Sequence, residues 1–255
     1  MQDLQLAIRS FADVTHDRAL DIARALDAHP HLRPLRVGGD PARIKVDPSM
    51  ETLVANQGLP IDWLTVRRNE PGGAFEGGKI NLREGRGVWF AEERPDGEMD
   101  FTLIGHELEQ TWEADTLEAD PASVEQIAML FEALVSATDA AWGCVLAEAW
   151  RPRPFNTTIT AALPGIFWMN YYGPAFVSRY PELPDHPRAR LLATGGVLIR
   201  TTDEPWEPDE RSTPAWQADL RDLFGTRAFK WKRPNPALPT VEDHVAASSG
   251  TMDMP

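Results

Sequence analysis

The clearest periodic segment of the chain is the apolar stripe within residues 120–135. Its apolar residues recur at three- and four-residue spacing, which places them on one face of a helix. They are Val124, Ile127, Phe131, Leu134 and Val135. Asp120 is a suitable N-cap, and Pro121 suits the first helical position because its missing N–H needs no partner there. The segment predicts an amphipathic helix.

Weaker patterns predict the other elements. Further helices are expected at about 16–28, 49–56, 174–180 and 213–224. Thr15 should cap the first of these, and Gly225 should follow the last, because glycine accepts a positive φ. Short apolar or alternating runs predict strands at 4–11, 61–66, 79–83, 88–94, 98–105, 142–149, 165–171, 188–193, 197–201 and 228–231.

The order of these elements predicts the fold class. Residues 1–150 read as a strand and a helix, an insertion at about 30–78, then a hairpin, a helix and a strand. Residues 155–233 read as β-α-β-β-α-β. We therefore expect an α+β protein of two ferredoxin-like (βαββαβ) halves, with one continuous antiparallel sheet through both halves as one arrangement. Residues 234–255 are rich in Pro, Ser and Asp, which predicts a disordered tail.

The net charge of the chain limits the classes of partner that it is expected to bind. The chain has 39 acidic and 25 basic residues, for a net charge of −14. An acidic surface disfavours direct binding to nucleic acid and to anionic membranes, and it suits a basic protein. No basic segment followed by an apolar run opens the chain, and no apolar run is long enough to span a membrane. With Cys144 as its single cysteine, the protein is expected to be cytoplasmic.

The sequence contains no complete catalytic or metal-binding motif. His106-Glu107-Leu108-Glu109-Gln110 approaches the zinc motif H-E-x-x-H, but glutamine stands where the second histidine is needed. The glycine-rich segment 72–78 is expected to be a flexible loop, and it lacks the Gly-Lys-Ser/Thr ending of a phosphate-binding loop. We therefore expect no catalytic residue, metal or cofactor.

The informative local feature is a run of acids. Residues 92–120 hold eleven acids and one base, and residues 107–120 hold six acids and no base. A second acidic cluster surrounds Trp206, and both Trp112 and Trp206 are expected to lie in acidic loops. Such surfaces are either solvated faces or docking surfaces that steer a basic partner, with an aromatic anchor inside. The candidate partner-binding residues are Glu107, Glu109, Trp112, Glu113, Asp115, Glu118, Asp203, Glu204 and Trp206.

One segment resembles a known family. Asn170-Tyr171-Tyr172-Gly173-Pro174, followed by an apolar helix, is similar to a strand-turn-helix signature of immunity proteins in bacterial toxin systems. Residues 165–231 resemble the immunity protein 52 family and related type VI secretion immunity proteins. The resemblance implies an α+β, non-enzymatic protein that neutralises a cognate toxin by binding it, and a nuclease is one candidate for that toxin.

Three hypotheses of function follow. The first is an immunity protein that blocks a basic cognate toxin by steric and electrostatic occlusion. The second is an enzyme of unknown reaction with its site between the two halves. The third is an adaptor that recruits partners through residues 234–255. A deep pocket lined by His106 and several carboxylates would favour the enzyme, and a flat acidic face would favour the immunity protein.

Overall fold

The computed structural model describes most of the chain. The described residues are 4–30, 32–34, 36–38, 44–58, 61–65, 75–82, 89–93, 99–103, 106–112, 122–147, 159–205, 215–230, 232 and 235–248. Between residues 61 and 112, and at positions 123, 147, 215 and 216, the description covers the backbone alone.

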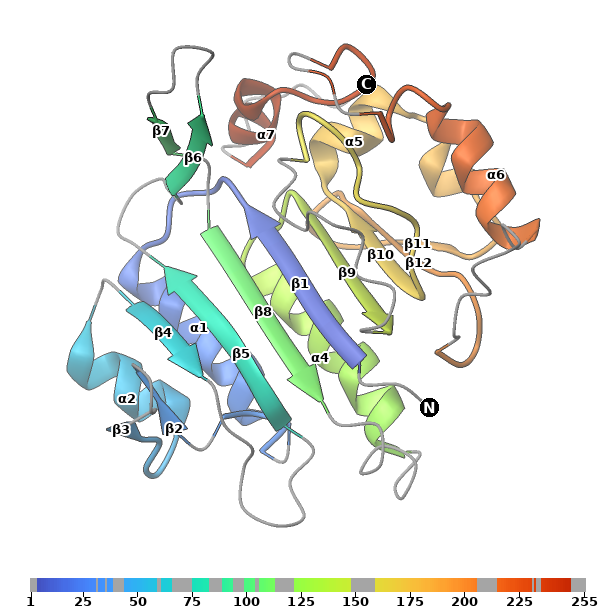
Figure 1. Cartoon of the computed structure of the whole chain (residues 1–255). Coiled ribbons are helices and arrows are strands. Elements are labelled where there is room, and N and C mark those ends of the chain that lie inside the picture. Colours follow the sequence, from blue (N-terminus) through green and yellow to red (C-terminus); the bar gives the residue numbers. More distant parts are fainter. Residues whose placement is uncertain are drawn as a thin grey trace.

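An eight-stranded sheet forms the centre of the molecule (Figure 1). Its strands lie in the order β11-β12-β10-β9-β1-β8-β5-β4, and every neighbouring pair is antiparallel. The bounds are β1 Leu4–Ser10, β4 Ile61–Thr65, β5 Phe75–Leu82, β8 His106–Trp112, β9 Trp142–Ala147, β10 Met169–Tyr172, β11 Ala189–Leu191 and β12 Val197–Arg200. The prediction of an α+β protein is confirmed, and one antiparallel sheet runs through both halves.

Alternate residues of the strands belong to two separate hydrophobic cores. In β1, Leu4, Leu6 and Ile8 belong to the first core, and Ala7 belongs to the second. In β10, Tyr171 and Tyr172 are divided in the same way. Because successive side chains of a strand point to opposite faces, this part of the sheet is buried on both faces. Burial on both faces accounts for the nearly continuous apolar character of these strands.

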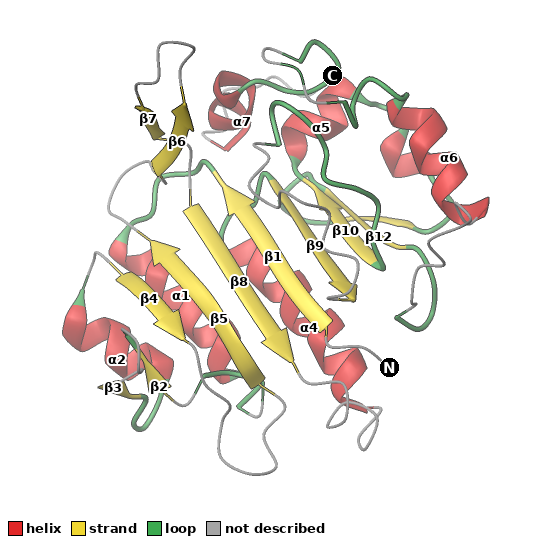
Figure 2. Ribbon diagram, viewed as in Figure 1, coloured by secondary structure: helices red, strands yellow, loops and turns green. Residues whose placement is uncertain are grey.

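Helices cover each face. The first core includes residues of α1 (His16–Asp27), α2 (Met50–Gln57) and α4 (Ala122–Ala137), and Figure 2 shows α1 and α4 behind the sheet. The second core includes residues of α5 (Pro174–Arg179) and α6 (Ala215–Phe224), with α7 (Val241–Ser248) packed against it. Each fully buried Leu or Phe contributes about 1.5–3 kcal/mol through its transfer from water.

Local signals in the sequence set the ends of several helices. The Thr15 side chain accepts a hydrogen bond from the Arg18 backbone N–H and caps α1, as predicted. Ser49 caps α2 in the same way. Gly225 follows α6 with a φ of 69°, which confirms its prediction.

Inside the two halves, the element order differs from βαββαβ. The first half runs β1-α1-β4-β5-β8-α4-β9, with three strands of the main sheet between its large helices. The predicted hairpin, β6 (Trp89–Glu93) and β7 (Met99–Leu103), forms a separate two-stranded sheet. One strand beside β1 is β8, which was missing from the predicted elements because its acidic residues were interpreted as a loop.

Glycine also misled the interpretation of β5. Gly77 and Gly78 were expected to lie in a loop, but they belong to the strand, and the register with β8 shifts between Phe75 and Gly77. Glycine inside a strand often accompanies such an irregularity. In the insertion, β2 (Arg36–Val37) and β3 (Ile44–Lys45) form a small sheet of their own.

The C-terminal predictions need two corrections. The expected strand at 228–231 is wrong, because the described residues there form turns in which Ala228 N–H donates to Gly225 and Lys230 N–H to Arg227. Helix α7 stands in the segment expected to be disordered. A short 3-10 helix, Leu183–Asp185, precedes β11.

Candidate functional site

Three of the predicted acidic-surface residues belong to a strand inside the sheet. Glu107, Glu109 and Trp112 lie on β8, which pairs with β1 on one side and β5 on the other. In register, Glu107 stands opposite Arg9 of β1. Placing Trp112 in an acidic loop was therefore wrong. Glu113, Asp115, Glu118 and Trp206 lie outside the described residues, so the acidic docking surface stays a prediction.

The family-like segment has a structural explanation. Asn170 is fully buried, accepts from the Phe167 N–H at 2.9 Å and donates to the Phe167 carbonyl at 2.8 Å. Tyr171 and Tyr172 are buried in the two cores. A Cβ at Gly173 would lie 2.6 Å from the backbone oxygen of Ala140, in the turn between α4 and β9, so only glycine fits. Pro174 occupies the first turn of α5.

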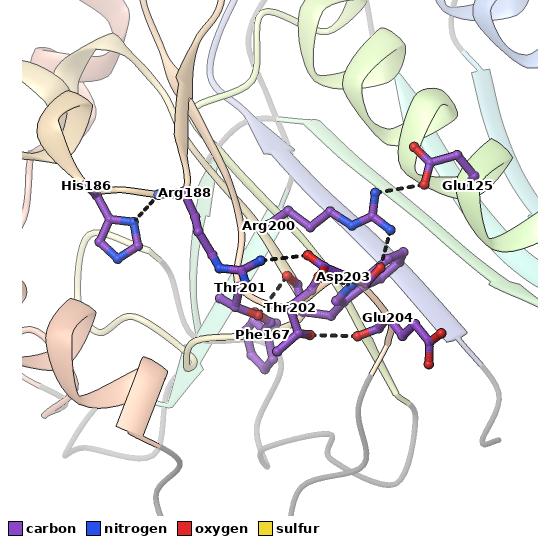
Figure 3. A network of polar contacts seen from close by, with 10 residues as sticks. Glu125, Phe167, His186, Arg188, Arg200, Thr201, Thr202, Asp203 and Glu204 are labelled. Atoms are coloured by element: carbon purple, nitrogen blue, oxygen red, sulfur yellow. Dashed lines mark hydrogen bonds and ion pairs between the residues drawn. The ribbon is translucent and has the colours of Figure 1, made fainter.

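The second predicted cluster is part of an ion-pair network (Figure 3). The Asp203 carboxylate accepts from Arg188 Nη1 at 3.0 Å, and the Asp203 carbonyl accepts from Arg200. Arg200 Nη1 donates to Glu125 of α4 at 2.7 Å, and its guanidinium lies 5.2 Å from the ring centre of Trp168. The Asp203 carboxylate is 92% exposed, but it is paired. Around Asp203, acids and arginines are therefore mixed. Beside it, the Glu204 carbonyl accepts from the hydroxyl of Thr202 at 2.6 Å.

A second ion pair extends this network along α4. Arg190 of β11 donates from Nη1 to Glu132 at 2.6 Å. Residues 125, 129 and 132 share one side of the helix, because their spacing is four and three. Met129, which is 56% exposed, therefore lies between the two glutamates. We call Glu125, Met129, Glu132, Arg190 and Arg200 the α4–β12 face.

The chemistry of the α4–β12 face suits binding. Two arginine–glutamate pairs surround one exposed apolar side chain, so the face is electrically balanced. Exposed ion pairs contribute about 0–1 kcal/mol each to stability, and their main effect here is to order side chains. Sequence reasoning missed this face, although a methionine among the polar positions of the helix was a usable signal.

A hollow of about 240 Å³ lies at the carboxyl end of β1. Its walls come from the β1–α1 loop, the first turn of α1, the α4–β9 turn and α7. The lining residues are Phe11, Ala12, Asp13, Thr15, Arg18, Asp139, Val245 and Ser248. Arg18 and Asp139 carry the two opposite charges at its centre, and Arg18 Nη2 lies 3.6 Å from Asp139 Oδ2. No sequence signal connected these residues, because the fold alone brings them together.

Two ionisable groups near the hollow have altered pKa values. Burial raises the pKa of the Asp139 carboxyl, which Arg18 and Ser248 oppose. Burial lowers the pKa of His244 on α7 to about 4, against a weak opposing effect of Asp243. The His244 ring stacks on Phe11 with ring centres 5.1 Å apart and contacts Phe176 at 5.4 Å. Helix α7 is therefore held by an uncharged aromatic contact.

Within the described residues, no three His, Cys, Asp or Glu side chains are grouped to hold a metal ion. No helix in the described part of the chain is long and apolar enough to cross a membrane.

Comparison with known proteins finds a likeness in structure. No family model and no curated protein matches the chain, so membership of the immunity protein 52 family is not supported. Among solved structures, the chain resembles the Pseudomonas aeruginosa T6SS protein PA0821, with a TM-score of 0.52 and 14% sequence identity. The match covers 87% of this chain and 76% of that one. At this identity the likeness shows a shared fold.

Proposed function

We propose that the protein is a cytoplasmic, non-enzymatic immunity protein of a type VI secretion system (T6SS), which binds and neutralises a cognate toxin. The observation that carries the proposal is the fold shared over 87% of the chain with a T6SS protein. The strand-turn-helix segment around Asn170 and Pro174 supports the same conclusion, since it resembles such immunity proteins.

Electrostatics indicate the character of the partner. A chain of net charge −14 attracts basic proteins over long range and raises their association rate. The proposed toxin is therefore basic, and a nuclease satisfies that requirement. Its inhibition would come from covering the toxin's active site.

The α4–β12 face is the proposed contact surface. Interfaces favour a central apolar anchor with arginines and a charged rim, which is the arrangement around Met129. The ion pairs of Glu125 and Glu132 hold the rim in place before binding, so less conformational freedom is lost when a partner docks.

Protection from the toxin tests this proposal. The protein encoded beside this one in the genome would be expressed with and without the chain, and cell growth would be measured. We expect growth arrest without the chain and recovery with it. Equal arrest in both cultures would refute the proposal.

A matched pair of substitutions tests the surface. Met129→Ala should weaken binding of the same neighbouring protein about tenfold, because a central anchor is lost. Ile44→Ala removes another exposed apolar side chain, on β3, and should change nothing. Equal affinities for both variants would exclude the α4–β12 face but not the immunity function.

A further inference from the structure

The hollow at the end of β1 has the features of a small binding site. Phe11 and Val245 give it apolar walls, and the polar residues Thr15 and Ser248 also line it. Its volume of about 240 Å³ accommodates one side chain or a ligand of a few heavy atoms.

The Arg18 guanidinium has hydrogen-bonding capacity to spare. It carries five N–H donors, but its Nη1 is buried without a hydrogen-bond partner. Its distance of 3.6 Å from Asp139 is longer than a hydrogen bond. Because the side chain is 29% exposed, the guanidinium can turn toward an acceptor that enters the hollow.

Asp139 supplies hydrogen-bond acceptors beside these donors. Its carboxylate has about four acceptor positions, and Ser248 and Arg18 engage it only in part. The residue adopts a φ of 49°, which fixes it in the turn between α4 and β9. A donor and an acceptor therefore stand side by side on the wall of the hollow.

This pairing selects a neutral ligand. An anion that approached Arg18 would meet the negative charges of Asp139 and Asp13, and a cation that approached Asp139 would meet Arg18. A carboxamide avoids both conflicts, since its oxygen accepts from the guanidinium and its N–H donates to the carboxylate. Both contacts are hydrogen bonds to a charged group, which are stronger than neutral ones.

We propose that this hollow binds a carboxamide group presented by the protein partner, either an Asn or Gln side chain or a peptide amide. Arg18 donates to the carbonyl oxygen, Asp139 accepts from the nitrogen, and Phe11 and Val245 contact the attached carbons. The inference rests on the proposed function for the identity of the partner. It gives helix α7 a role, because Val245 and Ser248 form one wall.

Three small probes of nearly the same shape test the chemistry. Isotope-labelled protein would be titrated with propionamide, propionate and propionamidinium, which are neutral, anionic and cationic, while amide resonances are followed by NMR. We expect saturable shifts at the residues of the hollow, with propionamide binding about tenfold more tightly than either charged probe. Tighter binding of a charged probe, or no saturable shift with any probe, would overturn the inference.

Substitutions of Arg18 and Asp139 test whether propionamide binds in the hollow. Asp139→Asn keeps the shape and tolerates the positive φ, and Arg18→Met keeps the length without the donors. Each should weaken propionamide binding about tenfold, and Asp47→Asn, which changes an exposed acid between β3 and α2, should not. Thermal unfolding of every variant would verify the fold. An equal loss in Asp47→Asn would contradict the assignment.

Binding to the protein partner distinguishes this inference from the proposed immunity function. Calorimetry with the neighbouring gene's protein would compare the wild type with the Asp139 and Arg18 variants. Weaker binding of both variants supports the inference. Equal binding by all three proteins refutes it and leaves the immunity function standing. If the wild type does not bind that protein, the proposed function fails, and the propionamide titration still decides whether the hollow recognises amides.

Discussion

The attachment of helix α7 should depend on pH through His244. The ring is 3% exposed, stacks on Phe11, and its Nε2 has no hydrogen-bond partner. Protonation would place a charge in this apolar contact without compensation. Burial lowers the pKa of His244 from 6.5 in its ordinary environment to about 4 in the folded protein.

The direction of the effect follows from proton binding. Between pH 6.5 and about pH 4, the unfolded chain binds a proton at His244 and the folded chain does not. Stability therefore falls as the pH falls through this window. With these two pKa values, the loss between pH 7.5 and pH 5 is about 2 kcal/mol, and it approaches about 3 kcal/mol below pH 4.

A substitution isolates this contribution. His244→Phe keeps a ring against Phe11 and Phe176 but cannot take up a proton. Urea unfolding at pH 7.5 and pH 5 should show that the wild type loses about 2 kcal/mol more than the variant. The raised pKa of Asp139 acts in the opposite direction, but it is present in both proteins and cancels in the difference.

The comparison can refute the reasoning. Parallel pH dependence in the wild type and His244→Phe would mean that His244 is not buried uncharged beneath α7. His244→Ala serves as a packing control, since it should destabilise at every pH by removing the ring contacts.

Three further predictions concern the fold. Gly173→Ala should lower stability by about 1–3 kcal/mol, measured by urea unfolding, because its Cβ would collide with the Ala140 carbonyl, and unchanged stability would contradict this close approach. Thr15→Ala should cost about 0.5–2 kcal/mol in the same assay through loss of the α1 cap, whereas Thr15→Ser should cost far less. Cys144, which is fully buried, should react with a thiol reagent only as fast as the protein opens, and rapid labelling of folded protein would contradict its placement.

Sequence reasoning succeeded where local chemistry decides the structure. The caps at Thr15 and Gly225 and the apolar stripe of α4 are local signals, and each element formed as predicted. The α+β class also followed from the order of elements, and the shared sheet was one arrangement that this order allowed. These features depend on neighbouring residues or on simple periodicity.

It failed where tertiary contacts override local preference. The acidic residues of β8 were predicted to form a loop. Pairing with β1 and β5 instead makes this segment a central strand. Helix α7 reads as disorder, yet His244 contacts Phe11 from the other end of the chain. The hollow shared by Arg18 and Asp139 has no local signature, because the fold alone brings its residues together.

Direct binding is the central claim. The purified chain would be titrated by calorimetry with the protein encoded beside it, at about 50 mM and about 300 mM salt, where electrostatic screening differs strongly. The account predicts a stoichiometric complex of nanomolar affinity that weakens at the higher salt concentration. Absence of heat and of a complex with a folded, active neighbour would contradict it.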